Sequence, residues 1–245
     1  MPDKPVLVLI HGHGVDASLW DGLYAVLSSE YPIIKPDFSG LTSHDTVEAY
    51  AEELYSLLMG AGGKQCVLIG HSMGGYIALA FADAHPEMLL GLGLFHSTAF
   101  ADDEDRKAKR QQAIEKLENE GSRAFIEDVV PKMFADSNQE RMADTLRQLV
   151  NKSSAIPAEA LVAGIKAIRS RPDRTHVLKN ARYPVLLIVG RQDNLVPFDK
   201  SQALFDMPAD AETLVLENSG HLGMIEQPAE TTQAIQEFLR RVEPQ

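Results

Sequence analysis

The chain has 245 residues, of which 44% are hydrophobic, and its formal net charge is -12. No apolar run reaches the about 18 residues that a membrane-spanning helix requires, and the negative charge argues against nucleic acid or an anionic membrane surface as a partner. The single cysteine, Cys66, cannot form an intramolecular disulfide and is expected to be a small core residue. Because no basic and apolar leader precedes Val6, we expect a cytoplasmic protein.

Short apolar runs alternate with amphipathic segments at both ends of the chain. Apolar strands that alternate with helices indicate a parallel sheet covered by helices on both faces. The expected strands are Val6–Ile10, Ile33–Lys35, Cys66–Ile69, Leu89–Phe95, Val185–Val189 and Thr213–Leu216. The expected helices between and after them are Ser18–Ser29, Thr46–Met59, Met73–His85, Asp199–Phe205 and Pro228–Val242.

The middle of the chain has a different pattern. From Ser97 to Arg182 there is no strand-like run, and helical periodicity recurs at about residues 105–120, 122–135, 138–151 and 157–170. Residues 101–180 contain 14 acidic and 15 basic side chains, so this segment is near +1 while the whole chain is at -12.

These shifts in pattern and charge predict an insertion. We expect residues 1–96 and 183–245 to form an α/β core, and residues 97–182 to form a helical cap inserted after the strand that ends near Phe95. Such a cap would lie at the carboxyl edge of the sheet, where open α/β sheets bind ligands.

The segment Gly70-His71-Ser72-Met73-Gly74 lies between an expected strand and an expected helix. A serine on such a turn is held in a strained backbone conformation with its hydroxyl above the sheet, and the flanking glycines make room for the tight turn. The helix N-terminus beneath it directs backbone N–H groups toward developing negative charge. We therefore predict that Ser72 is a nucleophile.

A serine nucleophile needs a base, and the base needs an acceptor that orients it. Asp193 follows the expected strand Val185–Val189, and His221 follows the expected strand Thr213–Leu216. The carboxyl ends of parallel strands meet at one edge, so both side chains should lie near Ser72. The order Ser, Asp, His along the chain is the one found in α/β-hydrolases. We predict His221 as the base and Asp193 as the orienting acid.

The glycine-rich turn His11-Gly12-His13-Gly14 follows the first expected strand. It can direct the backbone N–H of His13 toward the same site as that of Met73, and two converging donors would form an oxyanion hole. The alternative is a metal site at His11 and His13, but no further cluster of acidic or histidine residues completes a ligand set. We expect neither a metal nor a cofactor. Asp37, which precedes the nucleophile, is expected to tether a loop.

These segments together resemble the α/β-hydrolase superfamily, and the chain looks like a small capped serine-esterase-like member. The resemblance implies a parallel sheet of about six strands with flanking helices. Ser72 argues against those members of the superfamily that use an aspartate or a cysteine as nucleophile. The matching segments are His11-Gly12-His13-Gly14, Pro36-Asp37-Phe38-Ser39-Gly40, Gly70-His71-Ser72-Met73-Gly74, Gly190-Arg191-Gln192-Asp193 and Gly220-His221 through Glu226-Gln227-Pro228.

The implied activity is hydrolysis of a small or medium carboxylic ester through an acyl-enzyme intermediate. Cleavage of a lactone, a thioester or a carbon–carbon bond remains open, and so does a ligand-sensing role with a retained triad. Cationic side chains of the cap either clamp an anionic substrate or form solvated helix faces: Arg106, Arg110, Arg123, Arg141 and Arg147. The residues expected to line the substrate pocket are His96, Phe100, Phe125, Met133 and Phe134. The sequence does not indicate an oligomeric state.

Overall fold

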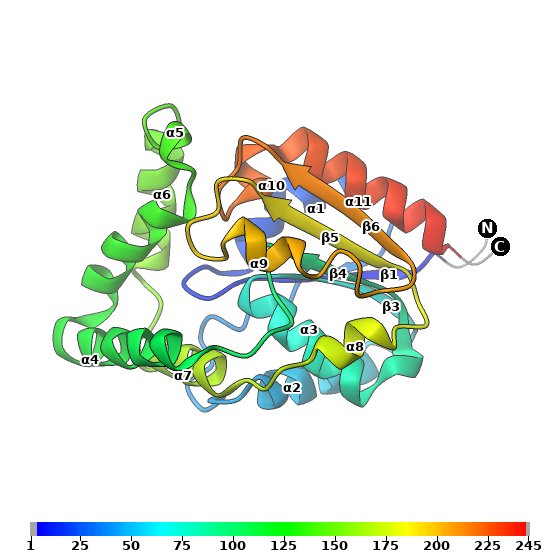
Figure 1. The fold of residues 1–245 in the computed structure, drawn as a ribbon, viewed down its shortest axis with the longest axis horizontal. Helices are drawn as coiled ribbons and strands as arrows, with labels where there is room; N and C mark the ends of the chain where they lie inside the picture. The colour runs from blue at the N-terminus through cyan, green and yellow to red at the C-terminus, as the bar shows by residue number, and fades with distance from the viewer. Residues whose placement is uncertain (1–3, 244–245) are drawn as a thin grey trace.

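A sheet of six parallel strands forms the centre of the protein in the computed structural model, which describes residues 4–243 (Figure 1). The strand order is β2-β1-β3-β4-β5-β6. The strands are β1 (Val6–Ile10), β2 (Ile33–Ile34), β3 (Cys66–His71), β4 (Leu89–Phe95), β5 (Val185–Gly190) and β6 (Ala211–Leu216). The expected six-stranded parallel sheet is thus confirmed.

Both faces of the sheet are covered by helices, and the alternation of side chains along β1 shows why. Leu7 and Leu9 belong to one buried apolar cluster, while Val8 belongs to the cluster on the opposite face. On the first face lie the short η1 (Ala17–Trp20), α1 (Asp21–Leu27), α10 (Gly223–Glu226) and α11 (Pro228–Val242). On the second face lie α2 (Val47–Gly60), α3 (Met73–Ala84) and α8 (Thr175–Lys179). The short η2 (Pro86–Met88) precedes β4, and α9 (Phe198–Gln202) packs beside β5.

The segment between β4 and β5 is helical, and all of its helices except the last lie beyond the carboxyl ends of the strands (Figure 1). It consists of α4 (Glu104–Met133), α5 (Asp136–Gln139), α6 (Ala143–Ser153) and α7 (Ala158–Ser170), followed by α8. The two helices expected at 105–120 and 122–135 are parts of α4, which is broken at Gly121, where φ is 79°.

This insertion is packed onto the sheet layers rather than held apart from them. Ile126 and Val130 of α4 belong to the same apolar cluster as Leu23 of α1 and Phe238 of α11.

Within residues 4–243, no helix is both long and apolar enough to cross a membrane.

Candidate active site

Ser72 occupies the turn between β3 and α3 and has a strained backbone, with φ of 52° and ψ of -116°. A positive φ costs a residue other than glycine about 1–3 kcal/mol, so the surrounding structure must hold it. The Ser72 N–H donates to Phe95 O at 2.9 Å, and its carbonyl accepts from Ser97 Oγ at 2.8 Å and from Gly75 N–H at 2.9 Å. The turn is therefore pinned to the residues that end and follow β4.

Two glycines allow this turn to lie close to its neighbours. A Cβ atom at Gly70 would collide with the carbonyl oxygen of Gly74, and one at Gly74 would collide with the carbonyl oxygen of Ile10. Both obstacles are backbone atoms, which cannot rotate away as a side chain can. The glycines of the Gly-x-Ser-x-Gly segment are thus required by contact with β1 and α3.

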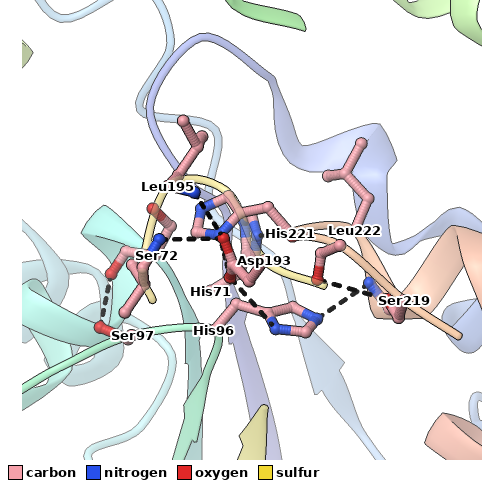
Figure 2. Close-up of polar contacts among 12 residues, drawn as sticks. His71, Ser72, His96, Ser97, Asp193, Leu195, Ser219, His221 and Leu222 are labelled. Atoms are coloured by element: carbon pink, nitrogen blue, oxygen red, sulfur yellow. Dashed lines mark hydrogen bonds and ion pairs between the residues drawn. The ribbon is translucent and has the colours of Figure 1, made fainter. Parts of the chain in front are cut away.

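Asp193 and His221 lie against each other beside Ser72 (Figure 2). The Nδ1–H of His221 donates to Asp193 Oδ2 at 2.7 Å, and both side chains are 2% exposed. The other carboxylate oxygen, Oδ1, accepts from the N–H groups of Leu195 at 2.8 Å and Val196 at 2.9 Å. Because Nδ1 carries the proton in this bond, Nε2 of His221 is left as the proton acceptor.

Burial tends to raise the pKa of Asp193, but the charge and hydrogen bond of His221 and the N–H of Val196 outweigh it and lower the pKa below its ordinary value. The carboxylate therefore stays ionised at neutral pH. An ionised acceptor at Nδ1 fixes the tautomer of His221 and stabilises its imidazolium form.

The backbone around His221 is held by the buried carboxylate of Glu226, which sequence reasoning did not identify. Its Oε1 accepts from Gly220 N–H at 2.9 Å and from Leu222 N–H at 3.3 Å, the amides on either side of His221. The remaining donors to this carboxylate are Ser219 Oγ at 3.2 Å, Ala135 N–H at 2.8 Å and Asn138 Nδ2 at 2.7 Å. The His221 loop is also bound to α4, because its N–H donates to Met133 O at 2.7 Å.

Two further histidines support these loops from beneath. The Nε2–H of His71 donates to the carbonyl of His221 at 2.8 Å. His96 is fully buried with a φ of 48°, and its Nε2 accepts from Gly223 N–H at 3.0 Å. Burial lowers the pKa of His96 to about 3, so the ring is neutral. Its Nδ1 lies 3.6 Å from Asp193 Oδ2, which is too long for a hydrogen bond, and the contact is not an ion pair.

The turn after β1 places His13 at the same site. The Nε2–H of His13 donates to Leu161 O at 2.9 Å, and its ring packs edge-on against Phe125. Burial lowers the pKa of His13 to about 4, so its side chain is neutral. Met73 begins α3, so its N–H is one of the amides without a partner inside the helix. These placements leave the backbone amides of His13 and Met73 as the candidate oxyanion donors.

His11 has both ring nitrogens engaged, since Nε2 accepts from Phe38 N–H at 2.9 Å and Nδ1 lies 2.8 Å from the carbonyl of Gly12. Asp37 accepts from the N–H of Ser39 at 3.0 Å, and its side chain is 56% exposed. Both residues thus organise the loops beside the site. Among residues 4–243, no three histidine, cysteine or acidic side chains are grouped as a metal site would require.

A cavity of about 300 Å³ contains Ser72 and His221. Its other walls come from the turn after β1, from α3, α4 and α7, and from the loop after β5. The lining residues are His13, Ser72, Tyr76, Arg106, Lys109, Arg110, Ala113, Phe125, Val129, Met133, Ile165, Ile168, Asn194, Leu195, Val196 and His221.

Of the five residues expected to line a substrate pocket, Phe125 and Met133 line this cavity, and the other three do not. Phe134 follows the end of α4 in an extended conformation and is fully buried in the core. Phe100 packs against the apolar cluster on the α2 and α3 face. His96 lies beneath Asp193, as described above.

A family model described as the alpha/beta hydrolase family matches residues 7–234. The chain belongs to the alpha/beta hydrolase family. It is an enzyme of the hydrolase class.

Individual alpha/beta hydrolases resemble the chain over nearly its whole length. A protein of Stutzerimonas stutzeri named as a carbamate hydrolase, RutD, is 28% identical over 236 residues, covering 91% of this chain and 87% of the relative. The pimeloyl-acyl-carrier-protein methyl ester esterase of Aeromonas hydrophila is 27% identical and covers 96% of this chain and 95% of the relative. A malate-bound structure of a thermophilic esterase from Thermogutta terrifontis has a TM-score of 0.93 and 29% identity, covering 100% of this chain and 92% of that protein.

Proposed function

We propose that this alpha/beta hydrolase cleaves small or medium carboxylic esters through an acyl-enzyme intermediate, with Ser72 as nucleophile, His221 as base and Asp193 as orienting acid. In the first step Ser72 Oγ attacks the ester carbonyl carbon while Nε2 of His221 accepts the hydroxyl proton. The N–H groups of His13 and Met73 stabilise the oxyanion that forms. The bond to the alcohol then breaks, and the alcohol leaves with the proton from His221.

In the second step His221 takes a proton from water, whose oxygen attacks the acyl-enzyme carbonyl. Collapse of the second tetrahedral intermediate releases the carboxylic acid, and the proton returns to Ser72 Oγ. Asp193 holds the Nδ1–H of His221 throughout and stabilises the imidazolium in both steps. The chemistry needs only these side chains and water.

The observation that carries this proposal is the buried 2.7 Å bond between His221 Nδ1 and Asp193 Oδ2 at the cavity that also contains the strained Ser72. The names of the methyl ester esterase and the thermophilic esterase give further support. We further propose residues 97–182 as a cap that supplies Phe125 and Met133 to an acyl pocket, over a core of residues 1–96 and 183–245.

The test is turnover of p-nitrophenyl esters together with labelling by a fluorophosphonate probe. The variant Ser72→Ala should lose both turnover and labelling while keeping the circular dichroism spectrum of the wild type. Ser43→Ala is the matched control, because Ser43 is exposed on a loop outside the cavity and should keep both. Turnover or labelling that persists in Ser72→Ala would exclude Ser72 as the nucleophile.

Lactones and thioesters present the same carbonyl to the same three residues, and one relative is named as a hydrolase of carbamates, which contain a related bond. A panel of esters, lactones, thioesters and carbamates at equal concentration therefore ranks these substrate classes. A ligand-sensing role predicts the opposite pattern, in which every member of the panel turns over very slowly and ligand binding changes affinity for a protein partner.

A further inference from the structure

One side of the cavity at Ser72 is positively charged. The side chains of Arg106, Lys109 and Arg110 line it, and none of the described lining residues is acidic. These three residues, here called the cationic rim, lie on one face of α4 because positions three and four apart are neighbours on a helix. They stand out in a chain whose net charge is -12.

The charge of the cationic rim is only partly neutralised by the protein. Within residues 4–243, no carboxylate lies in salt-bridge contact with Arg106 or Lys109. Arg110 Nε does contact Asp102 Oδ2 at 3.3 Å, but Arg171 Nη2 binds the other oxygen of the same carboxylate at 2.9 Å. One carboxylate thus serves two arginines, and the rim keeps an excess of positive charge.

Most of the other residues that line the cavity are apolar. Phe125, Val129 and Met133 are spaced four residues apart, so they present one face of the second half of α4 to the cavity. The apolar lining residues from α7 and from the loop after β5 are Ile165, Ile168, Leu195 and Val196. The cavity therefore combines the candidate nucleophile, apolar walls and the cationic rim.

We propose that the preferred substrate is an ester whose acyl chain ends in a carboxylate, such as a half-ester of a dicarboxylic acid. This inference rests on the proposed ester hydrolysis. The scissile carbonyl lies at Ser72, the chain contacts the apolar walls, and the remote carboxylate is bound by the cationic rim. An arginine fork binds a carboxylate through two parallel charge-assisted hydrogen bonds, whereas a neutral chain end leaves these donors without an anion.

The test compares monomethyl adipate with the methyl ester of adipamic acid, in which a neutral amide replaces the carboxylate at the same chain length. We expect the wild type to prefer the anionic ester by about tenfold in kcat/KM, which corresponds to about 1.4 kcal/mol. The double variant Arg106→Gln, Lys109→Gln should bring this ratio close to one, mainly by raising KM for the anionic ester. Added salt should also reduce the ratio in the wild type.

Arg123→Gln is the matched control. Arg123 also lies on α4, but its side chain is 69% exposed, is paired with Glu127, and is absent from the cavity lining. This variant should keep the wild-type ratio. A ratio near one in the wild type, or a preference that survives in the rim double variant, would overturn the proposal. A phosphate-terminated methyl ester cleaved in preference to the adipate ester would overturn the choice of carboxylate.

Calorimetric binding of monomethyl adipate to Ser72→Ala separates this proposal from the proposed reaction, because binding needs no turnover. Binding that the rim double substitution weakens, in an enzyme that cleaves neither ester, would support the rim and count against ester hydrolysis. Turnover of both esters at equal rates would support ester hydrolysis and exclude the anionic preference. Absence of both binding and turnover would count against both.

Discussion

Replacing Glu226 by glutamine should destabilise the protein more than the same substitution at an exposed glutamate, although glutamate and glutamine have the same shape. The carboxylate of Glu226 accepts five hydrogen bonds and donates none. A glutamine must place its NH2 group at one of the two oxygen positions. At either position the NH2 group faces N–H donors, and it cannot accept hydrogen bonds from them because it is itself a donor.

The magnitude follows from counting the donors at each position. At the Oε2 position the NH2 group faces Ala135 N–H and Asn138 Nδ2, and at the Oε1 position it faces Gly220 N–H and Leu222 N–H. The fifth donor, the hydroxyl of Ser219 at the Oε1 position, can rotate and accept from the NH2 group instead. Either orientation leaves two buried N–H donors without an acceptor. At about 1–3 kcal/mol for each unsatisfied buried group, the expected loss in unfolding free energy is about 2–6 kcal/mol.

Urea denaturation and thermal melting measure this loss directly. For a chain of this size, each kcal/mol lowers the melting temperature by about 2–4 °C. Glu230→Gln is the control, because Glu230 is exposed four residues further on and accepts a hydrogen bond from Gln227 Nε2. The Glu226→Gln variant should also lose kcat, since the amides on both sides of His221 lose their acceptor. An unfolding free energy within about 0.5 kcal/mol of the wild type, the range of ordinary surface changes, would refute this reasoning.

Three further changes test other contacts. Gly74→Ala should lower the free energy of unfolding by about 1–3 kcal/mol or more, because the added Cβ would collide with the Ile10 carbonyl in a packed core. Gly22→Ala, at an open position of α1, should stabilise the protein slightly. Urea unfolding of the two variants measures both changes. Asp102→Asn leaves the buried Arg171 without its anion and should cost about 3–5 kcal/mol at pH 7. Burial tends to raise the pKa of Asp102, but Arg171 and then Arg110 outweigh it and hold the pKa below the ordinary value of an aspartate, about 3.9. The difference between Asp102→Asn and the wild type should thus be full above that pH and shrink as the pH falls further, and a pH-independent difference would contradict the pairing.

The catalytic candidates could be located from the sequence because each depends on a local rule. Ser72 lies on a strand-to-helix turn bracketed by glycines, and Asp193 and His221 each follow a strand of a parallel sheet. The carboxyl ends of such strands share one edge, so three residues distant in sequence meet without any detailed knowledge of packing. The structure brings Asp193 and His221 within hydrogen-bond distance and places Ser72 on the same cavity.

The supporting contacts could not be found in this way because they join segments far apart in sequence. Glu226 binds Ala135, which lies 91 residues away, and nothing in the local pattern around either residue indicates the bond. Helical periodicity identifies an apolar stripe but not the surface that it faces. Met133 ends α4 and lines the cavity, while the next residue, Phe134, leaves the helix in an extended conformation and enters the core.

The contacts of His221 also limit how the helical insertion moves. Its N–H is bound to Met133 O at the end of α4, and Glu226 ties Ala135 to the same loop. Displacing this end of α4 would break the bonds that position the base. We therefore expect the half of α4 before the break at Gly121, which carries the cationic rim, to be the more mobile half. Hydrogen exchange should then be slower at the amides of His221 and Ala135 than in the first half of α4, and equal or faster exchange at those two amides would contradict this division.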